Sequence, residues 1–192
     1  MKLQVDHLTA TPKEYRHSLS AAQWRSLSGA DQDEELEAQE DFAFQLRAHV
    51  ASDDILIEGK IDGTVGAECS RCLERYRCAL HDDFRLVLEP AHDRRPQDPE
   101  GEESLSKHGL WLGEDLESGW YRGRVIDLDA YLAEVIALAM PVQPVCREDC
   151  EGLCPHCGAR RSEQRCECEE NLKPKSPFAA LAALQGDSEG SS

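Results

Sequence analysis

Nine cysteines carry the most evident chemistry of this chain, and eight of them lie in short, closely spaced groups. CREDCEGLCPHCG (residues 146–158) contains four, CSRC (69–72) contains two, and RCEC (165–168) contains two. A C-x2-C spacing lets two sulfurs converge on one ion from a single turn, and sets of four thiolates select tetrahedral zinc, with iron as the main rival. The sequence therefore predicts one or two zinc ions, with eight expected ligands: Cys69, Cys72, Cys146, Cys150, Cys154, Cys157, Cys166 and Cys168.

Two divisions of these thiolates into closed sites are open. The first division groups Cys154 and Cys157 with the two cysteines of RCEC as a local ribbon. It groups Cys146 and Cys150 with the two cysteines of CSRC. The second keeps the four cysteines of 146–158 together and joins RCEC to CSRC. The first is favoured because a locally complete ribbon closes shorter loops. One residue separates Cys166 from Cys168, so His156 is a possible substitute for one of them, and Cys78 is left over as a free thiol.

Closed four-thiolate sites are structural, since catalytic zinc keeps an open position and usually has histidine or carboxylate ligands. The sequence shows no phosphate-binding glycine loop, no nucleophile elbow and no histidine–carboxylate pair suited to acid–base work. We therefore expect a non-enzymatic protein. The alternative is a thiol-based redox or metal-handling protein, although a redox C-x-x-C pair would be expected within a thioredoxin-like βαβ frame.

The formal net charge of −17 and the isoelectric point near 4.7 constrain the partners of the protein. Such a surface repels phosphate backbones and attracts basic proteins. Positive charge gathers near the cysteines, where it can either neutralise thiolates or form a small basic island that touches RNA phosphates. The candidate contacts of this kind are Arg71, Arg75, Arg160, Arg161 and Arg165.

Composition indicates a soluble, globular chain, with 40% hydrophobic and 31% charged residues among 192. The first residues lack the apolar region of a secretory signal, and no stretch reaches the roughly 18 apolar residues of a membrane span. We therefore expect a cytoplasmic protein without a membrane partner. In a reducing compartment, clustered cysteines bind metal or do catalysis more often than they form disulfides, and the odd count argues against complete pairing.

A sheet and a helix are expected to position the cysteines. Apolar residues alternate with polar or small ones over 42–50, 55–61 and 84–88, which predicts three antiparallel strands, with CSRC between the second and the third. An apolar stripe at helical spacing predicts a helix over 128–140, with Asp127 as its cap and Pro141 as its stop. The expected fold class is α+β: an antiparallel sheet packed by one main helix, with a cysteine-rich zinc-knuckle or ribbon segment at the C-terminus.

The other segments give weaker patterns. We expect a short strand or arm over 1–12, helical spacing over 13–30, a charged linker over 31–40, a long acidic loop over 91–118 and a short helix within 176–186. Trp111 and Trp120, near the end of the acidic loop, are interpreted as packing anchors.

The expected division of the chain follows from these elements. Residues 1–145 form the α+β domain with the first knuckle and the acidic loop. Residues 146–185 form the metal-binding segment and the C-terminal helix, and residues 186–192 form a disordered tail.

Three segments together resemble one known family. AECSRCLERY, IDLDAYLAEVIALAMPVQPVCREDCEGLCPHCG and the terminal SPFAALAAL are similar to the YceD family of large ribosomal RNA subunit accumulation proteins, most specifically from residue 126 onward. The resemblance implies a bacterial ribosome-biogenesis factor that supports accumulation of large-subunit (23S) rRNA. It implies, as partner, a basic large-subunit ribosomal protein or a pre-ribosomal particle. Binding to rRNA alone is expected to be weak.

Overall fold

The computed structural model describes residues 1–28, 37–38, 40–113, 116–162, 166 and 168. The chain divides into two compact units. The first consists of Met1–Ser70 and Glu74–Cys146, and the second of Arg71–Leu73 and the described residues from Arg147 onward. In the described part of the chain, no helix has the length and apolar character needed to cross a bilayer.

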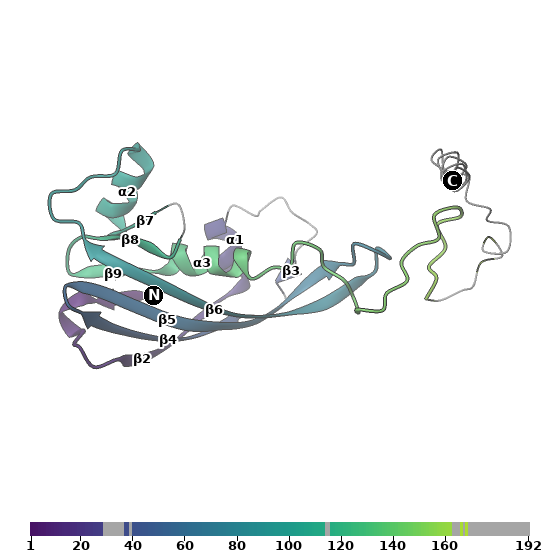
Figure 1. Cartoon of the computed structure of the whole chain (residues 1–192), viewed down its shortest axis with the longest axis horizontal. Coiled ribbons are helices and arrows are strands. Elements are labelled where there is room, and N and C mark those ends of the chain that lie inside the picture. The colour runs from purple at the N-terminus through teal and green to yellow at the C-terminus, as the bar shows by residue number, and fades with distance from the viewer. Residues whose placement is uncertain (29–36, 39, 114–115, 163–165, 167, 169–192) are drawn as a thin grey trace, which may run out of the picture. The chain divides into compact units, whose positions relative to one another are not determined.

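The first unit is built on one long, twisted sheet (Figure 1). Its strand order is β2-β4-β5-β6-β8-β7, and β3 pairs with the outer half of β5. All pairs are antiparallel except β6 with β8, which is parallel. The strands are β2 (Lys13–Leu19), β3 (Glu37–Ala38), β4 (Phe42–Ala51), β5 (Asp54–Glu68), β6 (Arg75–Pro90), β7 (Leu110–Leu112) and β8 (Ser118–Tyr121).

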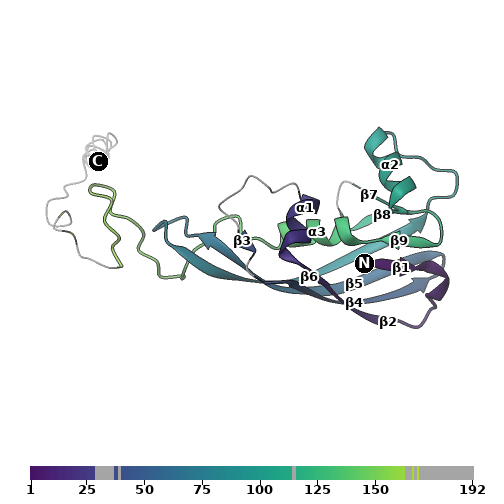
Figure 2. The ribbon, with the colours of Figure 1, turned by 180° about the vertical axis from the view of Figure 1, so that it is seen from behind.

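Helices and a small second sheet accompany this sheet. Strand β1 (Lys2–Gln4) pairs antiparallel with β9 (Val125–Asp127), and a 3-10 turn, η1 (Val5–His7), follows β1. The α-helices are α1 (Ala21–Ser28), α2 (Pro99–Lys107) and α3 (Asp129–Leu138). Figure 2 shows α1 and α3 on the same side of the sheet.

The core lies between the helices and one face of the sheet, because apolar residues alternate with exposed ones along β4 and parts of its neighbours. Phe42, Phe44 and Leu46 of β4 are buried while the residues between them are exposed. From α3, Leu132 and Ile136 are fully buried in the same cluster. The alternating apolar residues of the strands and the apolar residues of α3 therefore pack together in one hydrophobic core.

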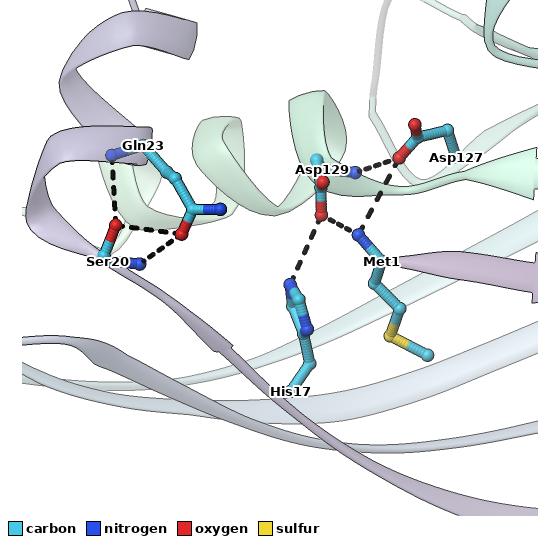
Figure 3. A network of polar contacts seen from close by, with 6 residues as sticks. All are labelled: Met1, His17, Ser20, Gln23, Asp127 and Asp129. Atoms are coloured by element: carbon cyan, nitrogen blue, oxygen red, sulfur yellow. Dashed lines mark hydrogen bonds and ion pairs between the residues drawn. The ribbon is translucent and has the colours of Figure 1, made fainter.

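Short-range polar contacts fix the starts of two helices (Figure 3). The Ser20 hydroxyl accepts from the Gln23 backbone N–H at 3.2 Å, and the Gln23 side-chain oxygen accepts from the Ser20 N–H at 3.0 Å, which is a capping box for α1. At α3 the Asp127 carboxylate accepts from the Asp129 N–H at 3.2 Å. Asp129 in turn lies 3.3 Å from His17 Nε2.

The structure confirms the main predicted elements. The strands over 42–50, 55–61 and 84–88 lie within β4, β5 and β6, with the CSRC turn between the last two. The helix predicted over 128–140 is α3; its N-cap residue is Leu128 rather than the predicted Asp127, whose carboxylate accepts from the Asp129 N–H. The strand predicted near the N-terminus is β1.

Two predictions are wrong, one for residues 13–30 and the other for residues 91–118. In the segment expected to have helical spacing, residues 13–19 form strand β2 instead, and Ala21–Ser28 form helix α1. The Tyr15 side chain that suggested helical spacing is placed inward by strand alternation, opposite Leu46 of β4.

The segment 91–118 is not a continuous loop. It contains α2, β7 and the first residue of β8. Asp98 caps α2 by accepting from the Gly101 N–H at 2.5 Å, and Pro99 occupies the first helical turn, where its missing N–H costs nothing. The described part of the chain therefore has three α-helices instead of one main helix, and its sheet has one parallel pair.

Several predictions fall on residues outside the described ranges. These are most of the 31–40 linker, the helix within 176–186, the 186–192 tail and Arg165. Within 31–40, Glu37, Ala38 and Glu40 are described, and the first two pair with Gly66 and Val65 as strand β3.

Candidate metal centres

The eight predicted ligands form two groups of four. One group is Cys69, Cys72, Cys146 and Cys150, and the other is Cys154, Cys157, Cys166 and Cys168. Within each group the sulfur atoms lie within 4.8 Å of one another. This is the grouping of the first division considered from the sequence. Neither group of described residues includes His156 or Cys78.

A tight turn after β5 presents Cys69 and Cys72. The Cys69 N–H donates to the Glu74 carbonyl at 2.9 Å, and Leu73 takes a left-handed conformation with φ of 58°. Ser70 donates twice to the Pro144 carbonyl, from its N–H at 2.8 Å and from its hydroxyl at 3.0 Å. These bonds hold the segment that precedes Cys146 against the knuckle.

Arg71 organises the backbone around Cys150. Its guanidinium donates to the carbonyls of Glu148 at 3.1 Å and Cys150 at 3.0 Å, and its own carbonyl accepts from the Leu153 N–H at 3.0 Å. Gly152, with φ of 75°, lies directly against this carbonyl, because a Cβ there would stand 2.9 Å from the Arg71 oxygen. The backbone of 148–153 is thus shaped around one arginine.

Tyr76 lies beside the first group of thiols. Burial, a hydrogen bond with Cys78 and the charges of Cys69 and Cys146 raise the pKa of Tyr76 to about 12. Cys78 is half-buried, and its sulfur lies 3.8 Å from the Ala79 carbonyl. Tyr76 and Cys78 face the same side of β6, as residues two apart in a strand must.

The second group begins in a turn built by CPHCG. The Cys154 N–H donates to the Ala159 carbonyl at 2.8 Å, and the Gly158 N–H donates back to the Cys154 carbonyl at 2.9 Å. Gly158 has φ of 73°, a left-handed conformation that glycine adopts without steric strain. Leu153 and Arg160 form an antiparallel bridge that closes the turn.

The charge state of the second group is set by the same turn. Backbone N–H groups of Cys157 and His156 stabilise the thiolate of Cys154, and together with Cys166 they lower its pKa to about 6. The pKa values of Cys166 and Cys168 are raised, chiefly by hydrogen bonds with Cys154 and Cys157, and that of Cys168 reaches about 12. Without a cation, therefore, Cys154 is largely a thiolate near neutral pH while Cys168 keeps its proton.

Both groups fit a tetrahedral ion. With zinc–sulfur bonds of about 2.3 Å, four sulfurs lie about 3.8 Å from one another. The observed limit of 4.8 Å allows this arrangement after small side-chain rotations. All eight donors are thiolate sulfurs, so the described residues offer four ligands to each ion and no open coordination position.

Four of the five candidate basic contacts, Arg71, Arg75, Arg160 and Arg161, lie in the described part of the chain, and Arg165 lies outside it. Arg71 donates to backbone carbonyls, as described above. Arg160 takes part in the Leu153 bridge, and the Arg161 N–H donates to the Gly152 carbonyl at 3.1 Å. Arg75 lies exposed at the start of β6, opposite Glu68.

Two contributors to this region, Tyr76 and the Pro144 carbonyl, were not among the predicted site residues. Tyr76 was not singled out, although its position two residues before Cys78 on a strand could have indicated it. The Pro144 carbonyl, which accepts from Ser70, could not have been found, because a backbone acceptor leaves no mark on residue type.

Comparisons with known proteins point to one family. Residues 57–185 match the family model described as "Large ribosomal RNA subunit accumulation protein YceD". An uncharacterized protein of Mycobacterium tuberculosis is 29% identical over 145 residues, which cover 73% of this chain and 60% of that protein. Another, from Mycobacterium leprae, is 28% identical over 113 residues, covering 59% of this chain and 46% of that protein.

A plant relative carries the family name. The "Large ribosomal RNA subunit accumulation protein YCED homolog 1, chloroplastic" of Arabidopsis thaliana is 24% identical over 155 residues, covering 70% of this chain and 46% of that protein. The matched region thus spans about 60% of the Mycobacterium tuberculosis relative and less of the others. No solved structure matches the chain.

Proposed function

The chain belongs to the YceD family of large ribosomal RNA subunit accumulation proteins, and on that basis we propose that it is a non-enzymatic, zinc-binding ribosome-biogenesis factor of the bacterial cytoplasm. In this role it supports accumulation of 23S rRNA by binding a ribosomal protein, rRNA or both. The observation that carries the proposal is the family match, which includes most of β5, from residue 57, together with β6, α3 and all eight clustered cysteines.

The metal has a structural part in this proposal. Zinc would be held by Cys69, Cys72, Cys146 and Cys150 in one site and by Cys154, Cys157, Cys166 and Cys168 in the other. The ion would supply positive charge that keeps four thiolates together, and closed coordination leaves no position for substrate or water. The surrounding side chains and backbone, Arg71 above all, hold the ligand turns in place.

Charge supports a basic protein as the main partner. The net charge of −17 opposes approach to an RNA backbone and favours lysine- and arginine-rich proteins. We expect a basic large-subunit ribosomal protein, or a pre-ribosomal particle that presents one, to bind more tightly than isolated rRNA. Direct rRNA contact would involve Arg71, Arg75, Arg160, Arg161 and Arg165, and it should weaken steeply with salt.

A second candidate function rests on Cys154. A thiol with a pKa of about 6 is largely thiolate at neutral pH, which suits thiol exchange or metal transfer. The two functions are separated by Cys154→Ser. Under the structural role, this variant loses zinc and local order. Under the redox or metal-handling role, it keeps its fold and loses exchange or transfer.

Affinity purification of the tagged chain from a bacterial lysate, with and without nuclease, tests the ribosomal role. We expect large-subunit ribosomal proteins to be recovered in both conditions. Recovery only while RNA is intact would make RNA the primary partner and reverse the order given above. Recovery of neither ribosomal proteins nor rRNA would contradict the ribosomal role itself.

A further inference from the structure

Strand β6 leaves most of one edge unpaired in the described part of the chain. On one side, β5 pairs with β6 continuously from the Glu68–Arg75 pair to the Ile55–Leu88 pair. On the other side, β8 pairs only with Val87–Pro90. Over residues 77–85, no described strand pairs with this second edge.

The direction of the backbone groups at this edge follows from the ladder. The Val87 N–H donates to the Glu117 carbonyl at 2.8 Å, which is away from β5. In an antiparallel ladder this direction recurs at every second residue. The residues that direct N–H and C=O groups to the unpaired edge are therefore Arg77, Ala79, His81, Asp83 and Arg85.

Two local contacts agree with this assignment. The Asp83 N–H, which β5 does not use, donates to the carboxylate of its neighbour Asp82 at 2.8 Å. The Ala79 carbonyl lies 3.8 Å from the Cys78 sulfur. Both partners are side chains of adjacent residues, which an incoming strand could replace.

A groove of about 150 Å³ lies beside this edge, between β6 and α3. Phe84, Tyr131, Val135 and Leu138 are among the apolar residues that line it. Leu138 is 65% exposed, which is unusual for a leucine so close to the core. The groove therefore offers apolar surface that the described residues do not cover.

Carboxylates dominate the rim of the groove. Among the described residues that line the groove, Asp82, Asp83 and Glu117 are acidic and Arg85 is the one cation. Asp83 pairs with Lys60 at 3.1 Å. Burial raises the pKa of Tyr131, and the negative charge of Glu117 adds to this effect, so this carboxylate is felt at the groove. An incoming cation would meet negative charge beside apolar surface.

We propose that this edge, residues 77–85 of β6 with the groove against α3, binds an extended lysine- or arginine-rich segment of a partner protein as an added strand. Main-chain hydrogen bonds to the outward groups of β6 would hold the segment. The aliphatic stem of a lysine or arginine would lie against Tyr131 and Leu138, with its charged head at Asp82 and Glu117. This proposal rests on the proposed function in one respect only, namely that the partner is a ribosomal protein.

A lysine–valine peptide tests the proposal directly. The probe is acetyl-(Lys-Val)4-amide carrying a fluorophore, with the matched (Glu-Val)4 peptide as control, each titrated into the full chain and followed by fluorescence anisotropy. We expect saturable binding of the basic peptide alone. Hydrogen exchange should slow at the outward amides of Arg77, Ala79 and His81 when the basic peptide binds.

Two variant pairs locate the site. Ala79→Pro removes an outward N–H without touching the ladder to β5, so it should weaken binding about tenfold. Ala79→Val keeps that N–H and should bind as the unmodified chain does. Should Ala79→Pro fail to fold, Glu117→Gln serves instead. It should weaken binding about two- to fivefold, while Glu14→Gln, the same charge change on β2, leaves binding unchanged.

Other outcomes would overturn the proposal. They are equal binding by Ala79→Pro and Ala79→Val, equal binding of the acidic peptide, and exchange protection confined to other strands. Concentration-dependent self-association abolished by Ala79→Pro would assign the edge to a second copy of the chain. Binding of an RNA oligonucleotide lost in Glu117→Gln would assign it to RNA.

The failure of this proposal and that of the proposed function can be told apart. Peptide binding at β6 without ribosomal proteins in the affinity purification would contradict the ribosomal role and leave the edge site standing. If Ala79→Pro recovered ribosomal proteins as efficiently as Ala79→Val, the result would contradict the edge site as the place where the partner binds and would leave the ribosomal role standing.

Discussion

The ring of Phe84 occupies the space that a side chain on Gly59 would need. The two residues are opposite each other in the β5–β6 ladder, and a Cβ built on Gly59 would lie 2.5 Å from Cζ of Phe84 and 2.8 Å from Cβ of Leu46. Phe84 in turn meets Phe44 and Tyr131 edge-on, with ring centroids 6.2 and 5.9 Å apart. The missing side chain of Gly59 thus lets one aromatic ring join β4, β6 and α3.

Gly59→Ala should destabilise the first unit by about 1–3 kcal/mol, because the added methyl overlaps Phe84 and Leu46 in a packed core. Urea unfolding followed by tryptophan fluorescence measures the loss. Phe84→Leu in the same chain makes room for the methyl, so the double variant should lose less than the sum of the two single variants. Strict additivity would contradict the contact described here.

Much of this architecture could be predicted because the sheet has one buried face. Phe42, Phe44 and Leu46 alternate with exposed residues, and α3 carries an apolar stripe. The spacing of apolar residues was therefore enough to predict both elements. The role of Gly59 could not be predicted, since it depends on which residue stands opposite in the next strand.

The wrong predictions have a different physical origin. Residues 91–118 are polar, but α2 gains its stability from a cap and from contact with Trp111, whose Nε1 would lie 2.4 Å from a Cβ on Gly101. Such a contact depends on tertiary packing, and composition does not report it. At the cysteines, spacing was informative because two ligands share each turn. It left the division between sites open, because that depends on which turns the fold brings together.

Zinc removal is expected to affect the two units unequally. The purified chain should contain one to two zinc ions and show no iron–sulfur absorbance. Chelation should release order in the cysteine-rich segment before the β4–β6 sheet melts, because Phe42, Ile57 and Leu86 hold the sheet without metal. Amide hydrogen exchange with and without chelator measures both regions. A metal-free chain with full protection from Arg147 to Arg161 would contradict a structural role for the metal.

The division into two sites makes a sharper prediction. Cys72→Ser and Cys157→Ser should each lose one zinc ion, and the double variant should lose both, because the two thiols belong to different groups. Cys78→Ser is the matched control and should keep both ions, since Cys78 lies in neither group. Metal content by elemental analysis gives the answer. Loss of both ions in Cys157→Ser alone would favour shared ligands over two separate sites.

Ser20→Ala should weaken the start of α1. The hydroxyl of Ser20 accepts from the Gln23 N–H, and its removal should cost about 1 kcal/mol of unfolding free energy. Ser26→Ala, an exposed position within the same helix, is the control and should change stability by less than about 0.5 kcal/mol. Thermal unfolding of the two variants measures the difference, and equal midpoints would show that the capping box contributes nothing.

Arg71 separates a structural role from a role in RNA contact. Its guanidinium donates to the carbonyls of Glu148 and Cys150, and these bonds shape the backbone that carries a predicted ligand. Arg71→Gln should therefore speed zinc release to a chelator by about three- to tenfold, corresponding to the loss of roughly one hydrogen bond. Arg147 is an exposed cation that pairs with nearby Asp149 at 3.3 Å, so Arg147→Gln should leave zinc release unchanged. If Arg71→Gln instead kept the zinc release rate and weakened rRNA binding at low salt, its main role would be phosphate contact, and the basic island would be the surface that meets RNA.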